Sequence, residues 1–185
     1  MNKKEIITSR LVLRNIKSDD IDDFLYYRSN KEVAKYQTWF PYTKEQALDT
    51  IKKYNQDTIG KPGEWTMYGI SLNDHNKIIG DCSFKADNHE SRNYEIGCSV
   101  SQDYQCKGYA KEAILALFDF IFNQLNGHRI TGITDTKNIS SINLLESLKM
   151  RKEAHFIKNI FFKGAWGDEY NYAILREEYR KWFIR

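Results

Sequence analysis

The sequence predicts an α+β fold, in which strands and helices share one core. Two strand-like runs, 65–72 and 77–84, flank the turn-forming residues 73–76 and indicate a hairpin. A third strand-like run, 94–100, leads through a short turn into a helical run at 110–124. The chain is therefore predicted to contain both a β-hairpin and a strand-to-helix connection, which fits an α+β fold.

The N-terminal part is predicted to form one strand and two helices. Residues 11–13 form the strand, and Ser18 is the expected cap of a first helix over 21–29, with Asp19 and Asp20 beside its positive end. The spacing of Thr43 and Gln46 is typical of a capping box. The second helix that follows has one apolar face, formed by Ala47, Ile51 and Tyr54.

The C-terminal part contains a further strand and helix. Gly97 lies inside the strand at 94–100, where glycine often marks a bulge or a close approach of another group. The run at 129–136 is a strand, followed by a helix over 140–148 that Asn138 is placed to cap. Apolar stripes on the two later helices form core faces: Ala113, Ile114, Leu117, Phe118, Ile121 and Phe122, then Leu144, Leu145 and Leu148.

Length and composition indicate one domain spanning 1–185. The chain has 185 residues and two prolines, and no linker or repeat divides it. Its net charge of +3 comes from basic residues interleaved with acidic ones, which gives no footprint for nucleic acid or an anionic membrane.

Cysteine usage and the N-terminus favour a cytoplasmic protein. The three cysteines have no metal-ligand spacing with each other or with histidine, so we expect reduced thiols and no metal. Lys3 and Lys4 precede an apolar run that is interrupted too early for a signal peptide, and no run has the length of a membrane span.

The turn at 105–110 is the strongest candidate for a binding site. A turn from a strand into a helix presents unpaired N–H groups next to the positive end of the helix dipole. Gly108 permits a close approach of a ligand, and Lys107 adds a cation. These features favour a diphosphate, although an ordinary strand-to-helix turn has the same local pattern.

The spacing Gln105-x-x-Gly108-x-Ala110 resembles the acetyl-CoA pyrophosphate motif of the GCN5-related N-acetyltransferase (GNAT) superfamily. Segments 8–14, 94–97 with 103–113, 138–148 and 172–179 resemble, in order, the branch that acetylates the N-termini of ribosomal proteins. The resemblance implies a mostly antiparallel sheet, flanked by helices and splayed between the strands at 94–100 and 129–136.

The same resemblance implies a set of acetyl-CoA-binding residues. The main chain of Cys98 and Val100 would pair with pantetheine in the splayed gap, and Asn138 would reach the pantetheine arm. The pyrophosphate would lie on the turn residues Gln105, Cys106, Lys107, Gly108, Tyr109 and Ala110. Cys106 has no histidine partner in the sequence pattern, so we interpret it as a spacer and not as a nucleophile.

The implied reaction is direct acetyl transfer to an amine. Glu95 is the candidate base, and an ion-paired strand carboxylate is its alternative role. Leu145 occupies the position of the tyrosine acid common in the superfamily, and Lys149-Met150 replaces a common Gly-Phe, which puts the local geometry of the helix end in doubt. Ser141 is the remaining hydroxyl that would interact with the thioester sulfur.

Three hypotheses for the function of the protein remain open. We expect a protein N-terminal α-amine as the acceptor, with a small amine (polyamine, amino acid or aminoglycoside) as the alternative and a non-catalytic acyl-CoA-binding module as the third hypothesis. The exposed strands of such folds often pair, so a homodimer is also open. Aromatic residues supply candidate walls of the acceptor pocket: Trp39, Phe40, Tyr42, Trp65, Phe161, Phe162 and Trp166. Three carboxylates are candidates to attract a cationic amine: Glu64, Asp168 and Glu169.

Overall fold

The protein is built around one sheet, seen in a computed structural model that describes residues 4–37, 39–40, 42–56, 59–90 and 92–184. Lys3, which was named in the sequence analysis, and Pro41, one of the two prolines, lie outside these ranges. Within them the sheet has eight strands in the order β1-β2-β3-β4-β5-β6-β8-β7. The strands are β1 (Ile6–Ile7), β2 (Leu11–Arg14), β3 (Trp65–Leu72), β4 (Ile78–Ala86), β5 (Asn93–Val100), β6 (Arg129–Asp135), β7 (Arg151–Phe162) and β8 (Ala165–Leu175).

Helices connect and flank these strands. The described α-helices are α1 (Ile21–Arg28), α2 (Lys31–Ala34), α3 (Lys44–Tyr54), α4 (Tyr109–Asp119), α5 (Ile139–Ser147) and α6 (Arg176–Phe183). A π-helical turn, Phe120–Gln124, continues α4. No helix in the described part of the chain has the length and apolar character needed to cross a bilayer.

The two faces of the sheet carry separate apolar clusters. Tyr94 and Ile96 of β5 pack with Leu117 of α4 and Leu145 of α5 in the larger cluster. Phe24 of α1 belongs to a second cluster, which also contains residues of α3 and β3. Because successive side chains of a strand point to opposite faces, Glu95 and Gly97 lie on the face away from α4 and α5.

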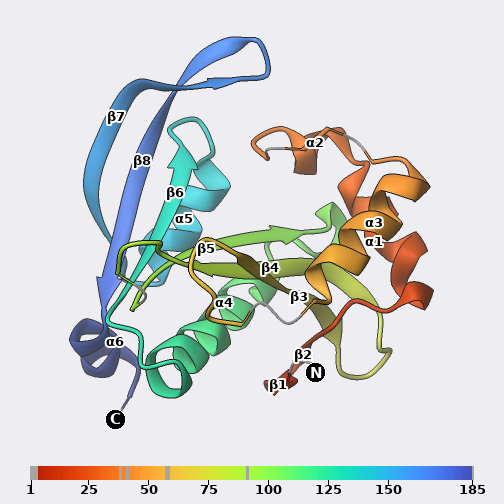
Figure 1. Cartoon of the computed structure of the whole chain (residues 1–185), viewed down its shortest axis with the longest axis horizontal. Helices are drawn as coiled ribbons and strands as arrows, with labels where there is room; N and C mark the ends of the chain where they lie inside the picture. Colours follow the sequence, from red (N-terminus) through yellow and green to blue (C-terminus); the bar gives the residue numbers. More distant parts are fainter. Residues whose placement is uncertain (1–3, 38, 41, 57–58, 91, 185) are drawn as a thin grey trace.

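The sheet is splayed between β5 and β6, as the resemblance implied. These strands pair in parallel only over Asn93–Ile96 and Arg129–Gly132. Beyond this point β5 continues beside β4 to Val100, and β6 continues beside β8 to Asp135. Figure 1 shows the two strands diverging, with the β7–β8 hairpin extending past the rest of the sheet on one side of the opening and α2 on the other.

The prediction that Ser18 caps the first helix is wrong. The Ser18 hydroxyl donates to Asp19, whereas the amide of Lys17 donates to Asp20 Oδ2 at 2.7 Å. Both oxygens of Asp20 also accept from the buried Arg14 guanidinium, at 2.7 and 2.9 Å. Asp20 is therefore the residue that organises this turn, because it neutralises a cation that β2 brings into the core.

The other local predictions have mixed outcomes. The Thr43–Gln46 capping box is confirmed, with bonds of 3.0 and 3.3 Å. A bulge at Gly97 is not found, since pairing with β4 runs through it without a shift, but a Cβ there would lie 3.1 Å from Ser83 Oγ. The sequence argument missed the short α2, which begins after the capping residue Asn30.

Candidate active site at the splayed strands

The turn before α4 presents a cluster of free backbone donors. Cys106 and Gly108 have left-handed backbone conformations, with φ of 59° and 83°, and Gly108 is the N-cap of α4. Within the described residues, the amides of 106–111 donate no hydrogen bond to the protein. Free N–H groups at a left-handed turn and a helix N-terminus form an anion-binding concavity. The turn at 105–110, the predicted phosphate loop, therefore presents unpaired backbone donors to an anion.

Two side chains of the loop are used to hold its shape. Gln105 Nε2 donates to the carbonyl of Val100 at 2.9 Å, which ties the loop to the end of β5. Lys107 Nζ donates to the carbonyl of Asp103 at 2.7 Å and lies over the Tyr104 ring. Cys106 is an exposed free thiol. Its positive φ is typical of glycine, which agrees with its interpretation as a spacer.

The main chain of Cys98 and Val100 faces the splayed gap. The amides of Ser101 and Asp87 donate to Ile79 and Asn93 across the β4–β5 ladder, both at 2.8 Å. Hydrogen-bonded pairs alternate along an antiparallel ladder, so the odd-numbered residues of β5 bond to β4. The even-numbered Cys98 and Val100 consequently direct their N–H and C=O groups toward β6, beyond the last β5–β6 pair.

The N-terminus of α5 lies on the other side of this gap. Asn138 Oδ1 accepts from the amide of Ser141 at 3.2 Å, so its predicted capping role is confirmed. Ser141 is partly exposed in the first turn. Leu145 is buried and packs so closely that a Cβ on Gly132 would meet its Cδ2 at 2.8 Å. An apolar side chain therefore fills the position at which the superfamily commonly has a tyrosine.

The replacement of Gly-Phe by Lys149-Met150 leaves the end of α5 intact. Lys149 adopts the left-handed conformation itself, with φ of 60°. The Met150 amide then donates to the carbonyl of Leu145 at 3.2 Å, which is the bond of a Schellman motif. Met150 is 4% exposed and takes the apolar position after the turn.

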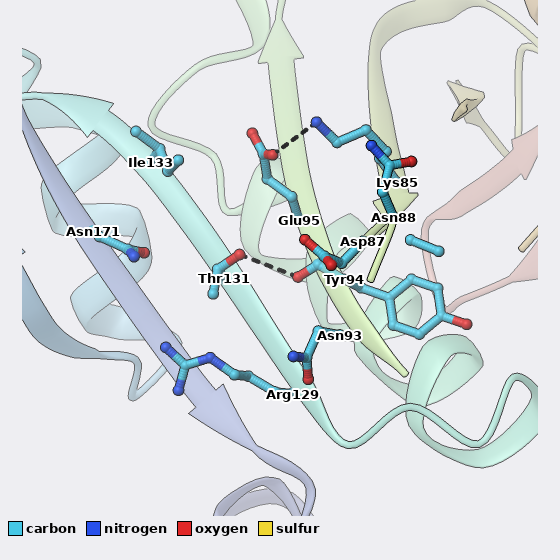
Figure 2. Close-up of a pocket in the computed structure, with 11 residues that line it drawn as sticks. Lys85, Asp87, Asn88, Asn93, Tyr94, Glu95, Arg129, Thr131, Ile133 and Asn171 are labelled. Atoms are coloured by element: carbon cyan, nitrogen blue, oxygen red, sulfur yellow. Dashed lines mark hydrogen bonds and ion pairs between the residues drawn. The ribbon is translucent and has the colours of Figure 1, made fainter. Parts of the chain in front are cut away.

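Glu95 lies on the opposite face of the sheet from α5. Its carboxylate pairs with Lys85 Nζ at 3.0 Å, and its strand position is opposite Thr131 in β6. It borders a polar pocket of about 360 Å³ (Figure 2). The pocket is lined by Lys85, Ala86, Asp87, Asn88, Asn93, Tyr94, Glu95, Arg129, Thr131, Ile133 and Asn171.

The charges in this pocket are nearly balanced. Lys85 is paired with Glu95, and Arg129 makes a close ion pair with Glu153. Asp87 accepts from the amides of His89 and Glu90, and these bonds lower the pKa of its carboxyl. In the described ranges, no three His, Cys, Asp or Glu side chains are placed to hold one metal ion.

A buried acidic centre next to the splay was missed in the sequence. Asp81 of β4 is opposite Ser99 of β5, and its Oδ2 accepts from Tyr27 Oη and Arg28 Nη2, both at 2.7 Å. Burial, followed by the charge of Asp81, raises the pKa of Tyr27 well above its usual value. The Arg28 guanidinium stacks over Trp39 at 3.7 Å. An aspartate inside an apolar strand was the available signal, because such residues are buried only when paired.

Two contacts join the end of α2 and the residues after it to the far side of the gap. Lys163, in the β7–β8 turn, donates to the carbonyl of Ala34 at 2.6 Å. Tyr36 Oη donates to the carbonyl of Lys137 at 3.1 Å.

The aromatic residues predicted to line the acceptor pocket have different surroundings. Trp39 and Tyr42 pack around Arg28. Three others are exposed: Phe40, Phe161 and Trp166.

Two of the three carboxylates predicted to attract an amine have other partners. Asp168 accepts from the Lys158 amide at 2.9 Å and pairs with His155 at 3.4 Å. Glu169 accepts from Asn159 at 2.6 Å. Glu64 precedes β3 and is exposed. None of the three lines the pocket beside Glu95.

Known proteins are similar to this chain in sequence. Residues 10–151 match the acetyltransferase (GNAT) domain. An N-acetyltransferase named p20 from Bacillus licheniformis is 33% identical over 94% of this chain and 97% of its own length. The [ribosomal protein uS5]-alanine N-acetyltransferase of Escherichia coli is 26% identical over 90% of this chain and 88% of its own.

Solved structures of acetyltransferases have a similar fold. A GNAT-family acetyltransferase from Bacillus anthracis superposes with a TM-score of 0.86 at 30% identity, over 95% of this chain and all (100%) of that one. A Vibrio cholerae spermidine N-acetyltransferase in complex with CoA and spermine has the same fold, with a TM-score of 0.78 at 22% identity over 93% and 99% of the two chains. This chain therefore belongs to the GNAT family of N-acetyltransferases, acyltransferases that use acetyl-CoA.

Proposed function

We propose that the protein transfers the acetyl group of acetyl-CoA directly to a primary amine, namely the N-terminal α-amine of a protein substrate. The cluster of free amides at 106–111, placed beside the splayed strands, is the observation that carries the cofactor part of this proposal. The acceptor part is supported by the balanced charge of the pocket beside Glu95.

Acetyl-CoA fits the residues around the gap. Cys98 and Val100 direct main-chain groups toward β6, where pantetheine amides would pair as an added strand does. The Val100 carbonyl already accepts from Gln105, so its N–H is the group left for the cofactor. Asn138 uses its oxygen as the α5 cap and keeps its side-chain amide as a donor. The diphosphate would be held by Gln105, Cys106, Lys107, Gly108, Tyr109 and Ala110.

The chemistry requires a proton acceptor for the amine and a donor near the leaving sulfur. The amine nitrogen forms a bond to the thioester carbonyl carbon, the carbon–sulfur bond breaks, and the thiolate takes up a proton. Glu95 and Ser141 lie on opposite faces of the sheet, with the gap between them. Glu95 would accept the amine proton on the acceptor face, and Ser141 would hydrogen-bond the sulfur on the α5 face.

A protein N-terminus suits this acceptor face better than a polyamine. Two or more protonated amines require carboxylates without competing cations, whereas Glu95 is paired with Lys85 and Glu153 with Arg129. An α-amine has an unperturbed pKa of about 8, compared with about 10.4 for lysine, so it needs less help from a base. The exposed Phe40, Phe161 and Trp166 would contact the protein that carries the N-terminus.

A small-amine acetyltransferase is the second candidate. The bonds from Lys163 to Ala34 and from Tyr36 to Lys137 join the two sides of the opening at α2. Such a closed arrangement would favour a compact acceptor over a polypeptide.

The test is acetyl-CoA-dependent release of CoA thiol with a panel of N-terminal peptides, polyamines, amino acids and aminoglycosides, and with acetyl-CoA binding measured in parallel. We expect turnover with peptides that begin with small residues. Turnover confined to small amines would replace the proposal with the second candidate. Binding of acetyl-CoA without turnover of any amine would instead indicate a non-catalytic acyl-CoA-binding module.

A further inference from the structure

The segment before β2 is bonded to the first turn of α4, although about 100 residues separate them in the chain. Glu112 Oε1 accepts from Thr8 Oγ1 at 2.7 Å, from Ser9 Oγ at 3.0 Å and from the Arg10 amide at 3.0 Å. Its second oxygen accepts from Arg10 Nε at 2.6 Å. One carboxylate therefore binds three consecutive residues of a segment that the proposed reaction does not otherwise use.

Arg10 also contacts the phosphate loop itself. Its Nη1 donates to the carbonyl of Lys107 at 3.1 Å. Its Nη2 would be 3.4 Å from a Cβ placed on Gly108, and its guanidinium lies 4.6 Å from the centre of the Tyr109 ring. Arg10 thus contacts Lys107 and Tyr109 and lies beside Gly108, while its side chain stays 48% exposed.

The bond to Lys107 determines the direction of a cofactor-facing donor. In a trans peptide, the carbonyl of one residue and the N–H of the next point in opposite directions, and no cis bond occurs among the described residues. Because Arg10 holds the Lys107 carbonyl, the Gly108 N–H points away from Arg10. In the described part of the chain that N–H has no acceptor, so it is left for an anion.

Arg10 also offsets a charge that would oppose an anion. Glu112 lies in the first turn of α4, where its carboxylate competes with a phosphate for the positive helix end. Partial burial raises the pKa of Glu112, but the bonds from Thr8 and Arg10 outweigh burial and lower it, which keeps the group ionised. The ion pair with Arg10 offsets this negative charge.

We propose that Arg10 is a positioning residue for acetyl-CoA: it orients the Lys107–Gly108 peptide toward the diphosphate and neutralises Glu112 beside it. This inference rests on the proposed function, because it assumes that the loop binds the diphosphate of CoA. It adds the segment 8–10 to the residues that determine cofactor affinity, through contacts with the loop and not with the reacting atoms.

The experiment compares CoA binding by calorimetry, and acetyl-CoA kinetics, for the whole chain and its variants. Arg10→Gln should weaken CoA binding roughly tenfold and raise KM for acetyl-CoA by a similar factor, with kcat at saturation unchanged. Arg10→Gln combined with Glu112→Gln should recover part of the loss, because the uncancelled carboxylate is gone. Arg92→Gln, which removes another exposed arginine that is ion-paired with an exposed glutamate, Glu90, is the matched control and should stay within about twofold of wild type.

The comparison of CoA with 3′-dephospho-CoA distinguishes the loop mechanism from direct phosphate contact. Equal losses for both ligands support the proposal, whereas a loss confined to CoA would mean that Arg10 binds the 3′-phosphate and would overturn it. Wild-type affinity in Arg10→Gln would also overturn it while leaving the proposed function intact. Failure of the wild-type protein to bind CoA would refute the proposed function itself. Arg10→Lys keeps the charge and provides a second variant if Arg10→Gln does not fold.

Discussion

At the scale of single residues, Gly108 has the most sharply defined requirement. Its φ of 83° places it in a region that side chains rarely adopt, and it lies between free amides on both sides. Gly108→Trp should abolish CoA binding and lower the free energy of unfolding by about 1–2 kcal/mol, because it adds both strain and bulk. Calorimetry with CoA and urea unfolding measure the two effects.

Gly164 provides the control for this substitution. It has a φ of 90° and open space around it, and it lies in the distant β7–β8 turn (Figure 1). Gly164→Trp should bear the same backbone strain and keep its CoA affinity. Unchanged affinity in Gly108→Trp would refute the assignment of the phosphate loop.

Glu95 is the residue whose predicted role depends on pH. If it accepts the proton of the amine, Glu95→Gln should lower kcat/KM by about 10²-fold below pH 8. The loss should shrink above pH 8, where the acceptor α-amine is already neutral. A pH–rate profile with the best peptide of the panel tests this, with the exposed Glu90→Gln as the control. A parallel downward shift at every pH would point to another proton route.

Residue-scale predictions from sequence succeeded where the role belongs to the local backbone. The conformation of Gly108 and the cap at Asn138 follow from their neighbours in the chain. The partners of Glu95 and Asp81 come from other elements, so their pairing with Lys85 and Arg28 could not be read from spacing. The resemblance located the loop, but the contact of Arg10 with it depends on how the sheet folds.

At the scale of elements, the turn between β2 and α1 shows why one cap was misassigned. Local sequence favours Ser18, but the buried Arg14 of β2 needs an anion and takes both oxygens of Asp20. The same buried pair then fixes the start of α1. By contrast, the bounds predicted for β3 are those observed, because its ends coincide with strong turn signals.

Asp20 therefore predicts a large and local effect on stability. Asp20→Ala should lower the free energy of unfolding by about 3–5 kcal/mol, because it leaves the Arg14 guanidinium buried without its partner. CoA affinity should be unchanged in the folded fraction. Urea unfolding measures the loss, and the exposed neighbour in Asp19→Ala should cost less than about 0.5 kcal/mol. Equal effects of the two substitutions would show that the pair is not the organising contact.

At the scale of the whole molecule, the order of the strands was the part least accessible to sequence. The β3–β4 hairpin follows from turn signals, but the parallel contact of β5 with β6 spans α4 and was expected only from the family resemblance. That contact has four residue pairs and joins β1–β5 to β6, β8 and β7. This short pairing ends beside the gap in which the cofactor is proposed to bind.

This architecture predicts that CoA stabilises the whole protein by bridging the two parts of the sheet. At a concentration 100-fold above Kd, binding adds roughly 2.7 kcal/mol to the free energy of unfolding. For a chain of 185 residues this corresponds to a rise in Tm of roughly 5–10 °C. Hydrogen exchange should slow at the amides of Cys98, Val100 and 106–111, which have no strand or helix partner across the gap in the described structure. Gly108→Trp should show neither effect, and protection confined to other segments would place the cofactor elsewhere.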